Sequence, residues 1–386
     1  MKKFVLFMVL VCLISLFPIN GLALEEEKLI PNAVSGLLMD VDSGKIIFEK
    51  EVTKEVAVAS MTKMMAQILI LEKIEAGDIK WDDIVTVSKN AADMGGSQIY
   101  ISEGEKISVE DLMKGISMAS GNDATVAMAE YIAGSEAKFV KMMNKRAKDL
   151  GLKNTNFVNV HGLDEDGHYS SAKDMATIAR ELIVKHPEIF RFSSVYEDYL
   201  RENTKNKFWL VNTNKLVHFY EGADGLKTGS TDNAGYCLAA TAKRGDLRLL
   251  AIVLGEKDAT TRNTETMNLL DYGFSNVKVK KLKNKGDVVK KIRLDKANSE
   301  VVKVILKDDL LVTEMVDENI KDYKYSIDVD NFKLPVKKGD TVGKIKVLSK
   351  NKVVKESELT VSKNIKSLGY FELLINEIED LILGEY

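Results

Sequence analysis

Residues 59–77 read ASMTKMMAQILILEKIEAG, a pattern that predicts a helix from about Ser60 to Ala76, ended by Gly77. The apolar positions cover more than one stripe of this helix, so we expect it to be buried on most sides. These positions are Met61, Met64, Met65, Ile68, Leu69 and Leu71. The stretch therefore predicts the centre of a domain, with other elements packed around it.

Strands are predicted on both sides of a helical middle region. Residues 34–39 and 45–48 flank the turn Asp42-Ser43-Gly44, a pattern typical of a hairpin. Further strands are predicted at residues 225–230, 236–242 and 247–254. Helices are predicted at residues 108–119, 124–132, 136–150, 172–184 and 260–272. Asn122-Asp123 is expected to cap the second of these. This order predicts an α+β fold in which helices cover one antiparallel sheet.

The length of 386 residues favours two domains with appendages. Residues 1–23 are typical of a signal peptide, because Lys2 and Lys3 precede an apolar run and small residues end at Ala23. Residues 24–275 are the predicted main domain. Alternating Lys and Val predict a small all-β domain over residues 276–361. An amphipathic helix is predicted within residues 362–386, from Ile365 onward.

Composition and charge exclude several classes of function. The chain has 45% hydrophobic and 29% charged residues, as in ordinary globular proteins, and its net charge of -3 argues against a nucleic-acid partner. Its four histidines form no His-Glu-x-x-His pattern, so no metal is expected. Leu226 precedes Lys227 where a phosphate-binding loop needs glycine, and no cofactor is expected either.

Three short motifs occur in order along the chain. They are Ser60-Met61-Thr62-Lys63, Ser120-Gly121-Asn122 and Lys227-Thr228-Gly229. The first opens the buried helix, the second lies on a predicted loop between helices, and the third lies on a predicted strand. Each motif is short, so this structural context carries most of the evidence.

Ser60 and Lys63 are placed for nucleophilic chemistry. They lie three residues apart on a predicted helix, so their side chains share a face and the amine can reach the hydroxyl. An unaided serine is a poor nucleophile, and a lysine can act as its base if burial and a nearby cation lower the lysine pKa. The alternative is that Ser60 only caps the helix and Lys63 is a solvated surface lysine.

The three motifs together resemble those of the low-molecular-mass penicillin-binding proteins of the D-alanyl-D-alanine carboxypeptidase family. Supporting stretches are Met94-Gly95-Gly96-Ser97, residues 119–124, His161-Gly162-Leu163, Gly167-His168-Tyr169-Ser170 and residues 224–230. The resemblance covers residues 34–272, and more loosely the small β domain. It implies a β-lactamase/transpeptidase-like fold and a serine peptidase that trims peptidoglycan stem peptides ending in D-Ala-D-Ala, with β-lactams as covalent inhibitors.

The resemblance also implies the catalytic roles. Ser60 would attack the carbonyl of the penultimate D-Ala, Lys63 would accept its proton, and Ser120 would relay a proton to the leaving amine. The backbone amides of Ser60 and Ser230 would form the oxyanion hole. Water would then release the acyl chain.

Substrate binding is implied for the remaining motif residues. Asn122 would hold the substrate amide. Lys227 and Thr228 would bind the terminal carboxylate, with Gly229 beside them on the strand. Arg262, at the start of the closing helix, aligns with an arginine of the family in the carboxylate region.

Other readings of the same motifs remain open. A class A β-lactamase also needs a deacylating glutamate in a Glu-x-x-Leu-Asn stretch, whereas Glu165 is followed by Asp166-Gly167-His168. A non-catalytic penicillin-binding sensor would not need Ser60, Lys63 and Ser120 together. Endopeptidase cleavage of cross-links would use the same site.

The two ends of the chain predict its location. The signal peptide predicts export to the outer face of the cytoplasmic membrane or the cell wall. The last helix carries an apolar stripe that could lie on a membrane surface, although its polar face is acidic. The stripe contains Leu368, Phe371, Leu374, Ile375, Ile378, Leu381 and Ile382. Packing on the β domain or on a second copy is the alternative.

Overall fold

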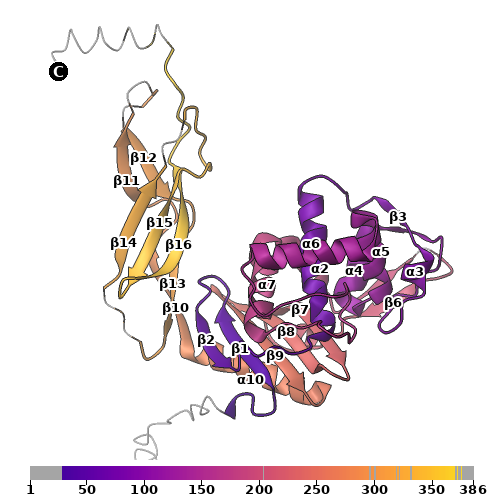
Figure 1. The fold of residues 1–386 in the computed structure, drawn as a ribbon. Coiled ribbons are helices and arrows are strands. Elements are labelled where there is room, and N and C mark those ends of the chain that lie inside the picture. Colours follow the sequence, from indigo (N-terminus) through magenta and orange to yellow (C-terminus); the bar gives the residue numbers. More distant parts are fainter. Residues whose placement is uncertain are drawn as a thin grey trace, which may run out of the picture.

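The computed structural model places most of the chain in two regions (Figure 1). It describes residues 28–202, 204–294, 297–299, 301–318, 320, 322–330, 333–369, 372 and 375. The predicted signal peptide, residues 1–23, lies outside the described residues.

The main region contains a five-stranded antiparallel sheet in the order β2-β1-β9-β8-β7. Its strands are β1 (Ser35–Asp40), β2 (Ile46–Lys50), β7 (Ala223–Thr231), β8 (Gly235–Arg244) and β9 (Leu247–Glu256). The first and last parts of the domain therefore join in one sheet, because β1 pairs with β9. The strand β7 lies at an edge, so one side of it is available to line a cleft.

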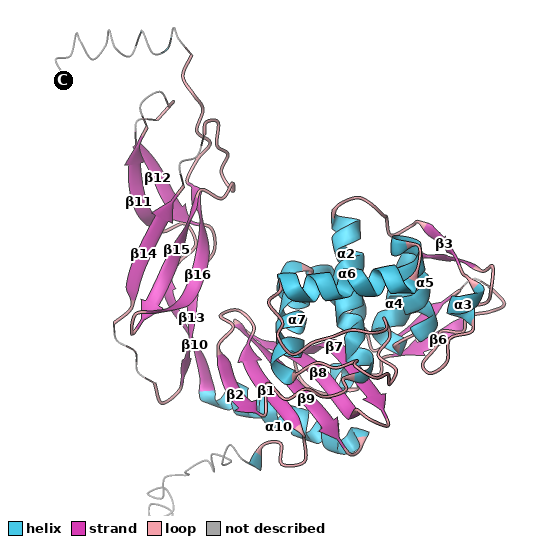
Figure 2. Ribbon diagram, in the orientation of Figure 1, coloured by secondary structure: helices cyan, strands magenta, loops and turns pink. Residues whose placement is uncertain are grey.

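Both faces of this sheet are covered, as Figure 2 shows. Successive side chains of a strand point to opposite faces. In β9, Leu250 and Ile252 belong to the core shared with the helical layer, whereas Leu249 and Ala251 belong to the core under the closing helix. Two buried faces explain why this strand is a continuous apolar run. The α+β fold and the antiparallel sheet are confirmed.

Helices occur on both sides of the sheet. The helical layer and its connections contain α2 (Lys63–Glu75), α3 (Lys89–Ala92), α4 (Val109–Lys114), α5 (Asn122–Ala133), α6 (Glu136–Asp149), α7 (Ala172–Lys185), α8 (Phe190–Ser193) and α9 (Leu216–Phe219). The closing helix is α10 (Ala259–Asn276). A short 3₁₀ turn, η4 (Pro187–Ile189), joins α7 to α8.

Several helix boundaries differ from the sequence prediction. The closing helix passes Gly273 and ends at Asn276 instead of residue 272, and α5 begins at Asn122 instead of residue 124. The helix α2 begins at Lys63, and Ser60 lies in a preceding 3₁₀ turn, η2 (Ala59–Thr62). The helix predicted over residues 108–119 ends as α4 at Lys114 and continues as a wider π turn, η3 (Gly115–Ala119). The backbone is wound more tightly than an α-helix in η2 and more widely in η3. Apolar periodicity alone does not reveal such changes.

Two short two-stranded antiparallel sheets were missed by the sequence prediction. They are β3 (Ile84–Thr86) with β4 (Lys106–Ser108), and β5 (Glu197–Leu200) with β6 (Phe208–Val211). Their strands are only three or four residues long.

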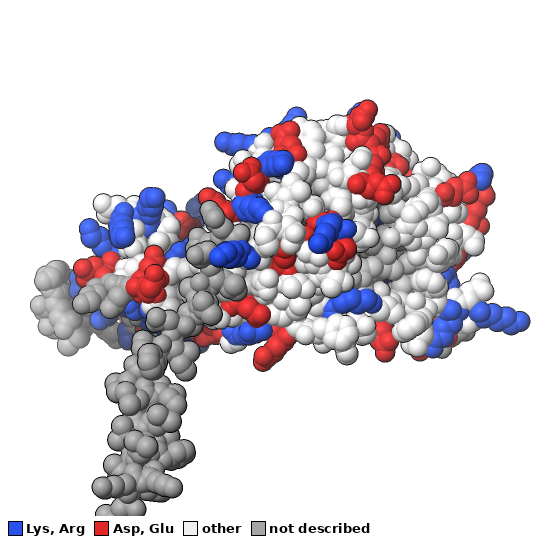
Figure 3. All heavy atoms as spheres, turned by 90° about the horizontal axis from the view of Figure 1, so that it is seen from below, with Lys and Arg blue, Asp and Glu red and all other residues white. Residues whose placement is uncertain are grey.

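The C-terminal region is all-β, as predicted. Its strands are β10 (Val277–Lys283), β11 (Val288–Arg293), β12 (Val301–Leu306), β13 (Leu310–Met315), β14 (Lys324–Val329), β15 (Gly343–Ser349) and β16 (Lys352–Val361). It contacts the main region through polar groups: Thr313 Oγ1 donates to Asp40 at 2.6 Å, and Lys45 pairs with Glu318 at 2.9 Å. On the face in Figure 3, acidic and basic side chains are interspersed.

The predicted last helix does not begin at Ile365. Ile365 forms a β-bridge with Val336, and Ser367 forms one with Ala297. Extended backbone here pairs with the β domain, which removes these residues from any helix. Glu372 and Ile375 are helical and exposed, and the other residues of the predicted apolar stripe beyond 369 lie outside the described residues. Among the residues described, no helix has the length and hydropathy needed to cross a membrane.

Candidate active site

Ser60 lies where three segments of the chain meet. The η2 turn that carries it begins with a left-handed residue, Ala59, with φ of 48°. Strand β7 passes so close that a Cβ on Gly229 would lie 3.0 Å from the backbone nitrogen of Ser60. A Cβ on Gly162 would lie 1.9 Å from the carbonyl oxygen of Ala59. Glycine at positions 162 and 229 therefore lets a loop and a strand pack directly against the turn.

The Lys63 amine is surrounded by three oxygen atoms. Its Nζ lies 2.7 Å from Ser60 Oγ, 2.7 Å from Asn122 Oδ1 and 2.8 Å from the His161 carbonyl oxygen. The carbonyl and the amide oxygen can only accept hydrogen bonds, whereas the hydroxyl can also donate. A neutral amine can therefore give its two N–H bonds to Asn122 and His161 and direct its lone pair at the Ser60 proton.

Burial favours this neutral form. Lys63 has no exposed surface, and desolvation followed by the charge of Lys227 holds its pKa well below the ordinary lysine value, against a smaller opposite effect of Asp123. The prediction that Lys63 could be a solvated surface lysine is thus excluded. The same hydrogen-bond partners can accept from the ammonium form, so the amine is satisfied in both states.

The Ser-x-Asn motif enters the site from the end of the π turn. Ser120 adopts a left-handed conformation with φ of 61°, and it is 4% exposed. Ser120 lines the same cavity as Ser60, and its buried Oγ has no hydrogen-bond partner among the residues described. This hydroxyl is therefore free to bond to a molecule in the cavity.

Asn122 and Asp123 were predicted to cap the following helix, and this was wrong. The N-cap position is Gly121, and Asn122 is already the first helical residue. Asn122 instead accepts from Lys63 and donates through Nδ2 to the Gly95 carbonyl at 2.7 Å. Asp123 accepts from the backbone amides of Ile99 at 3.0 Å and of Ile101 at 3.3 Å. Asn122 thus fixes the loop around the site, whereas Asp123 holds both that loop and, at 2.8 Å, the Ala124 amide in the first turn of the helix. One Asn122 amide hydrogen is left for another acceptor.

Strand β7 contributes the third motif. Lys227 is 1% exposed and its Nζ donates to the Thr228 carbonyl at 2.8 Å. Burial, with a further contribution from the charge of Arg262, lowers the pKa of Lys227 to about 7. Thr228 Oγ1 donates to Thr213 Oγ1 at 2.8 Å. A buried cation beside hydroxyl groups is suited to binding a carboxylate.

The motifs line one cavity of about 380 Å³. Its walls contain Ser60, Ser97, Ser120, Val211, Thr213, Lys215, Thr228, Gly229, Ser230, Tyr236, Ala259, Arg262 and Asn263. Arg262 is 5% exposed and is held by Asn263 Oδ1, 2.9 Å from its Nη2. The structure thus brings all the predicted site residues to one cavity or, for Lys63, Asn122 and Lys227, to hydrogen-bond contact with its wall.

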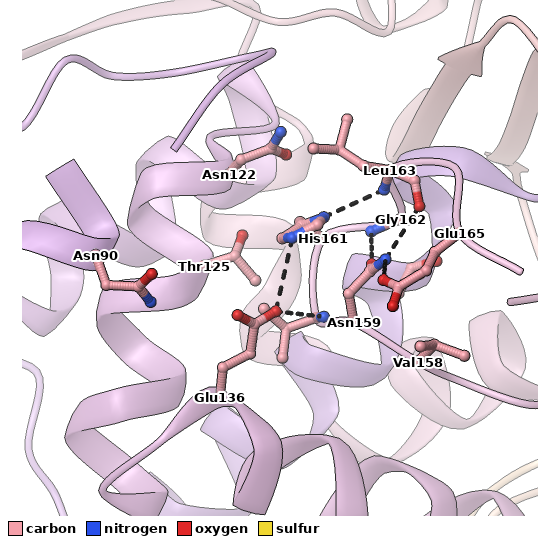
Figure 4. Close-up of polar contacts among 12 residues, drawn as sticks. Asn90, Asn122, Thr125, Glu136, Val158, Asn159, His161, Gly162, Leu163 and Glu165 are labelled. Atoms are coloured by element: carbon pink, nitrogen blue, oxygen red, sulfur yellow. Dashed lines mark hydrogen bonds and ion pairs between the residues drawn. The ribbon is translucent and has the colours of Figure 1, made fainter. Parts of the chain in front are cut away.

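The loop at residues 159–168 carries the His161 carbonyl that contacts Lys63, and it is held by its own hydrogen bonds (Figure 4). The Asn159 side chain accepts from the Gly162 amide at 2.7 Å and donates to Glu165 at 3.0 Å. His168 Nδ1 accepts from the Val158 amide at 3.1 Å. Burial is the main cause that lowers the pKa values of both His161 and His168 to about 4. Hydrogen bonds from the Val158 and Leu163 amides to their Nδ1 atoms hold both imidazoles in the loop.

Several cavity residues were missed by sequence reasoning. Thr213 and Lys215 lie between β6 and α9, where no short motif marks them. Thr213 is fixed because its amide donates to the Met118 carbonyl at 3.0 Å and its neighbour Asn212 makes buried hydrogen bonds. Ser97 is part of the quoted stretch Met94-Gly95-Gly96-Ser97, but the sequence assigned it no role in the site.

The comparisons with known proteins cover both regions. The family model described as D-alanyl-D-alanine carboxypeptidase matches residues 25–258, and the one described as Penicillin-binding protein 5, C-terminal domain, matches residues 278–367. The D-alanyl-D-alanine carboxypeptidase DacF of Bacillus subtilis is 43% identical over 357 residues, covering 92% of each chain.

Solved structures of penicillin-binding proteins are similar to this chain in fold. Penicillin binding protein 5 from Haemophilus influenzae has a TM-score of 0.68 at 31% identity and covers 87% of this chain and 98% of its own. Penicillin-binding protein D2 from Listeria monocytogenes, in its ampicillin-bound form, has a TM-score of 0.57 at 34% identity over 63% of this chain and 98% of its own. On the family match, the identity and the arrangement of the site, this chain belongs to the D-alanyl-D-alanine carboxypeptidase family of penicillin-binding proteins.

Proposed function

We propose that this enzyme removes the terminal D-Ala from peptidoglycan stem peptides through an acyl-enzyme on Ser60. Family membership makes the chain a serine-type D-Ala-D-Ala carboxypeptidase that acts on peptidoglycan and binds β-lactams. The assignment of the reaction to particular residues is our proposal. The observation that carries it is the Lys63 amine, fully buried and 2.7 Å from Ser60 Oγ.

Acylation begins with the neutral Lys63 amine. It takes the Ser60 proton while Oγ attacks the carbonyl carbon of the penultimate D-Ala. The backbone N–H groups of Ser60 and Ser230 stabilise the oxyanion. Ser120 then relays the proton from Lys63 to the leaving D-Ala amine as the peptide bond breaks, so that Lys63 is neutral again. A water molecule attacks the ester and restores the Ser60 hydroxyl.

The remaining motif residues and Arg262 orient the substrate in the cavity. Lys227, Thr228 and Arg262 bind the terminal carboxylate, and the free Asn122 amide hydrogen binds a substrate carbonyl. A β-lactam presents a carboxylate and an amide in a similar arrangement and acylates the same serine.

Mass spectrometry of the penicillin-treated protein tests this proposal. We expect one covalent adduct, located on the peptide that contains Ser60, and release of D-Ala from a diacyl-Lys-D-Ala-D-Ala peptide. An adduct on another residue would overturn the assignment. Acylation without D-Ala release would leave only the sensor reading, and rapid turnover of the penicillin would favour the β-lactamase reading. Against the latter, Glu165 lines a separate hollow with Gly162 and Asn233 and bonds to Asn159.

The activity should fall as pH rises through the Lys227 pKa. A lysine loses its charge above its pKa, and that of Lys227 is lowered to about 7. We therefore expect kcat/KM to fall about tenfold per pH unit above neutrality, because the carboxylate partner becomes neutral. Lys227→Arg should remove this descending limb, since a guanidinium stays charged. A descending limb at the same pH in wild type and variant would rule out Lys227 as its source.

Peptidoglycan lies outside the cytoplasmic membrane, so the enzyme acts there. We propose that residues 1–23 direct export and are removed, that residues 24–275 and 276–361 are the two domains of the mature enzyme, and that the helix within residues 362–386 associates with the membrane surface. The apolar stripe of that segment supports the last point.

Truncation tests the membrane proposal. After signal cleavage has been verified by N-terminal sequencing, the full chain should be found with membranes and a variant lacking residues 370–386, which keeps the β-bridges of Ile365 and Ser367, should be soluble. Because the polar face is acidic, vesicles of zwitterionic lipid should bind the full chain more strongly than anionic ones. Retention of the truncated variant in the membrane fraction would refute membrane association through this helix.

A further inference from the structure

The hairpin β5–β6 continues one wall of the catalytic cavity onto the protein surface. Tyr199 and Trp209 lie directly opposite each other in the ladder, and Glu197 lies opposite Val211. Val211 lines the cavity. Side chains two residues apart on a strand share a face. Glu197, Tyr199, Trp209 and Val211 therefore form one surface, here called the hairpin face, which runs from the cavity outward.

The aromatic rings of the hairpin face are exposed. The exposed fractions are 56% for Trp209 and 38% for Tyr199. In Figure 1, β6 lies at the end of the main region away from strands β10–β16, so the C-terminal domain does not cover it. Exposed large aromatic groups beside a cavity are typical of binding surfaces.

The opposite face of the hairpin is firmly packed. Leu200 and Leu210 are buried, and the Phe208 ring meets Tyr100 edge-on with centroids 5.6 Å apart. Asp198 forms an ion pair with Lys114 at 2.8 Å. The hairpin is thus a fixed support, so its exposed rings can bind a ligand with little loss of conformational entropy.

Polar groups flank the exposed rings. Lys207 Nζ lies 3.7 Å from the Tyr199 ring centroid, and Glu197 is exposed beside Val211. Lys207 covers one face of the Tyr199 ring, so the open stacking surface is the Trp209 ring and the other face of Tyr199. Such rings beside charged groups suit a sugar, whose apolar C–H face stacks on an aromatic ring while its hydroxyl groups bond to polar neighbours. Two aromatic residues are too small an area for a stable dimer interface, which needs about 800 Å² per partner. Charged neighbours also make the surface unfavourable for insertion into lipid.

We propose that the hairpin face binds the amino-sugar glycan strand of peptidoglycan next to the catalytic cavity. The inference rests on the proposed function, because stem peptides are attached to this polymer and reach the cavity together with it. The Thr213 hydroxyl contacts Thr228 at the carboxylate end of the cavity, so the hairpin face lies on the side where the leaving D-Ala departs. A glycan held there belongs to a neighbouring strand, and it keeps the enzyme on the polymer between cleavage events.

Soluble glycan strands freed of stem peptides are the probe, because they cannot enter the cavity as substrate. We expect them to quench the tryptophan fluorescence of the full exported chain. We expect Trp209→Ala and Tyr199→Ala each to weaken glycan binding by about tenfold or more, a loss typical of removing one stacking ring. Activity on whole sacculi should fall by a similar factor, whereas kcat/KM for a soluble tripeptide should stay within about twofold of wild type. Ser60→Ala should bind the glycan normally.

The matched control is Tyr325→Ala, which removes an aromatic side chain 41% exposed in the C-terminal domain. It should leave glycan binding unchanged. Equal binding by wild type and the Trp209→Ala, Tyr199→Ala double variant would overturn the proposal. So would a loss of dimer or of vesicle binding in that variant with glycan binding intact. Loss of soluble tripeptide cleavage by the wild type would refute the proposed function instead, without bearing on glycan binding.

Discussion

Ser60→Ala and Lys63→Met will each lower the rate of penicillin acylation and of D-Ala release by about 10⁴-fold or more, as expected when one member of a nucleophile–base pair is removed. Without Oγ there is no nucleophile. Without the Lys63 amine, no base lies within hydrogen-bonding distance of Ser60 Oγ among the described residues. Stopped-flow acylation by a reporter β-lactam and a D-Ala release assay measure the two rates.

The rate of the double variant Ser60→Ala, Lys63→Met is a stricter test of this prediction than either single variant. The two residues act as one unit, so the double variant should be no slower than the slower single variant. Lys63→Met also leaves Asn122 Oδ1 and the His161 carbonyl without a donor, at a cost of about 1–3 kcal/mol each. Thermal unfolding must therefore show that the variant is folded.

Lys73→Met is the matched control on the same helix. Lys73 forms an ion pair with Asp78, its side chain is 36% exposed, and it lies outside the cavity. It should leave the acylation rate unchanged. A Lys63→Met variant that is folded and acylates at more than about one hundredth of the wild-type rate would show that another group supplies the base.

Gly162→Ala will lower both stability and acylation. The Gly162 φ of 86° is unfavourable for alanine by about 1–2 kcal/mol. Its Cβ would also lie 1.9 Å from the Ala59 carbonyl oxygen, so backbone must shift, which adds about 1–3 kcal/mol. The shift moves the η2 turn that carries Ser60 and the His161 carbonyl that bonds to Lys63. We expect a loss of about 2–5 kcal/mol in the free energy of unfolding, with slower acylation of the molecules that remain folded.

Gly151→Ala separates the two causes. Gly151 has a similar φ of 72°, but nothing lies within 4 Å of its added Cβ. It should cost only the conformational part, about 1–2 kcal/mol, and leave acylation unchanged. Denaturant unfolding and acylation rates measure both variants. Equal losses at the two positions would mean that the contact between the loop and the η2 turn does not hold the site.

The Ser60–Lys63 contact was predicted from helix periodicity, and it is present although the α-helix begins only at Lys63. It persists because a 3₁₀ turn also aligns residues i and i+3 on one side. The helix cap predicted at Asn122-Asp123, by contrast, is not decided by local backbone geometry. A helix cap and a loop support need the same residue types, and only the loop at residues 95–101 decides between them.

Tyr199 and Trp209 are a second feature that the sequence did not predict. Alternation in two four-residue strands is a weak signal, so neither strand was predicted. The sequence also gives no means of knowing that Val211 reaches the cavity, because its neighbours there are far away in the chain.

The sequence by itself determined the kinds of groups available and their local spacing: a hydroxyl and an amine one turn apart, a Ser-x-Asn loop and a lysine on a strand. These depend only on local backbone geometry. Tertiary structure decided that Asn122, His161 and Lys227 surround Lys63 and that water is excluded from it. The reason is physical: a pKa is set by desolvation and by charges within a few ångströms, and those neighbours come from segments 59 and 98 residues away in the chain, or further.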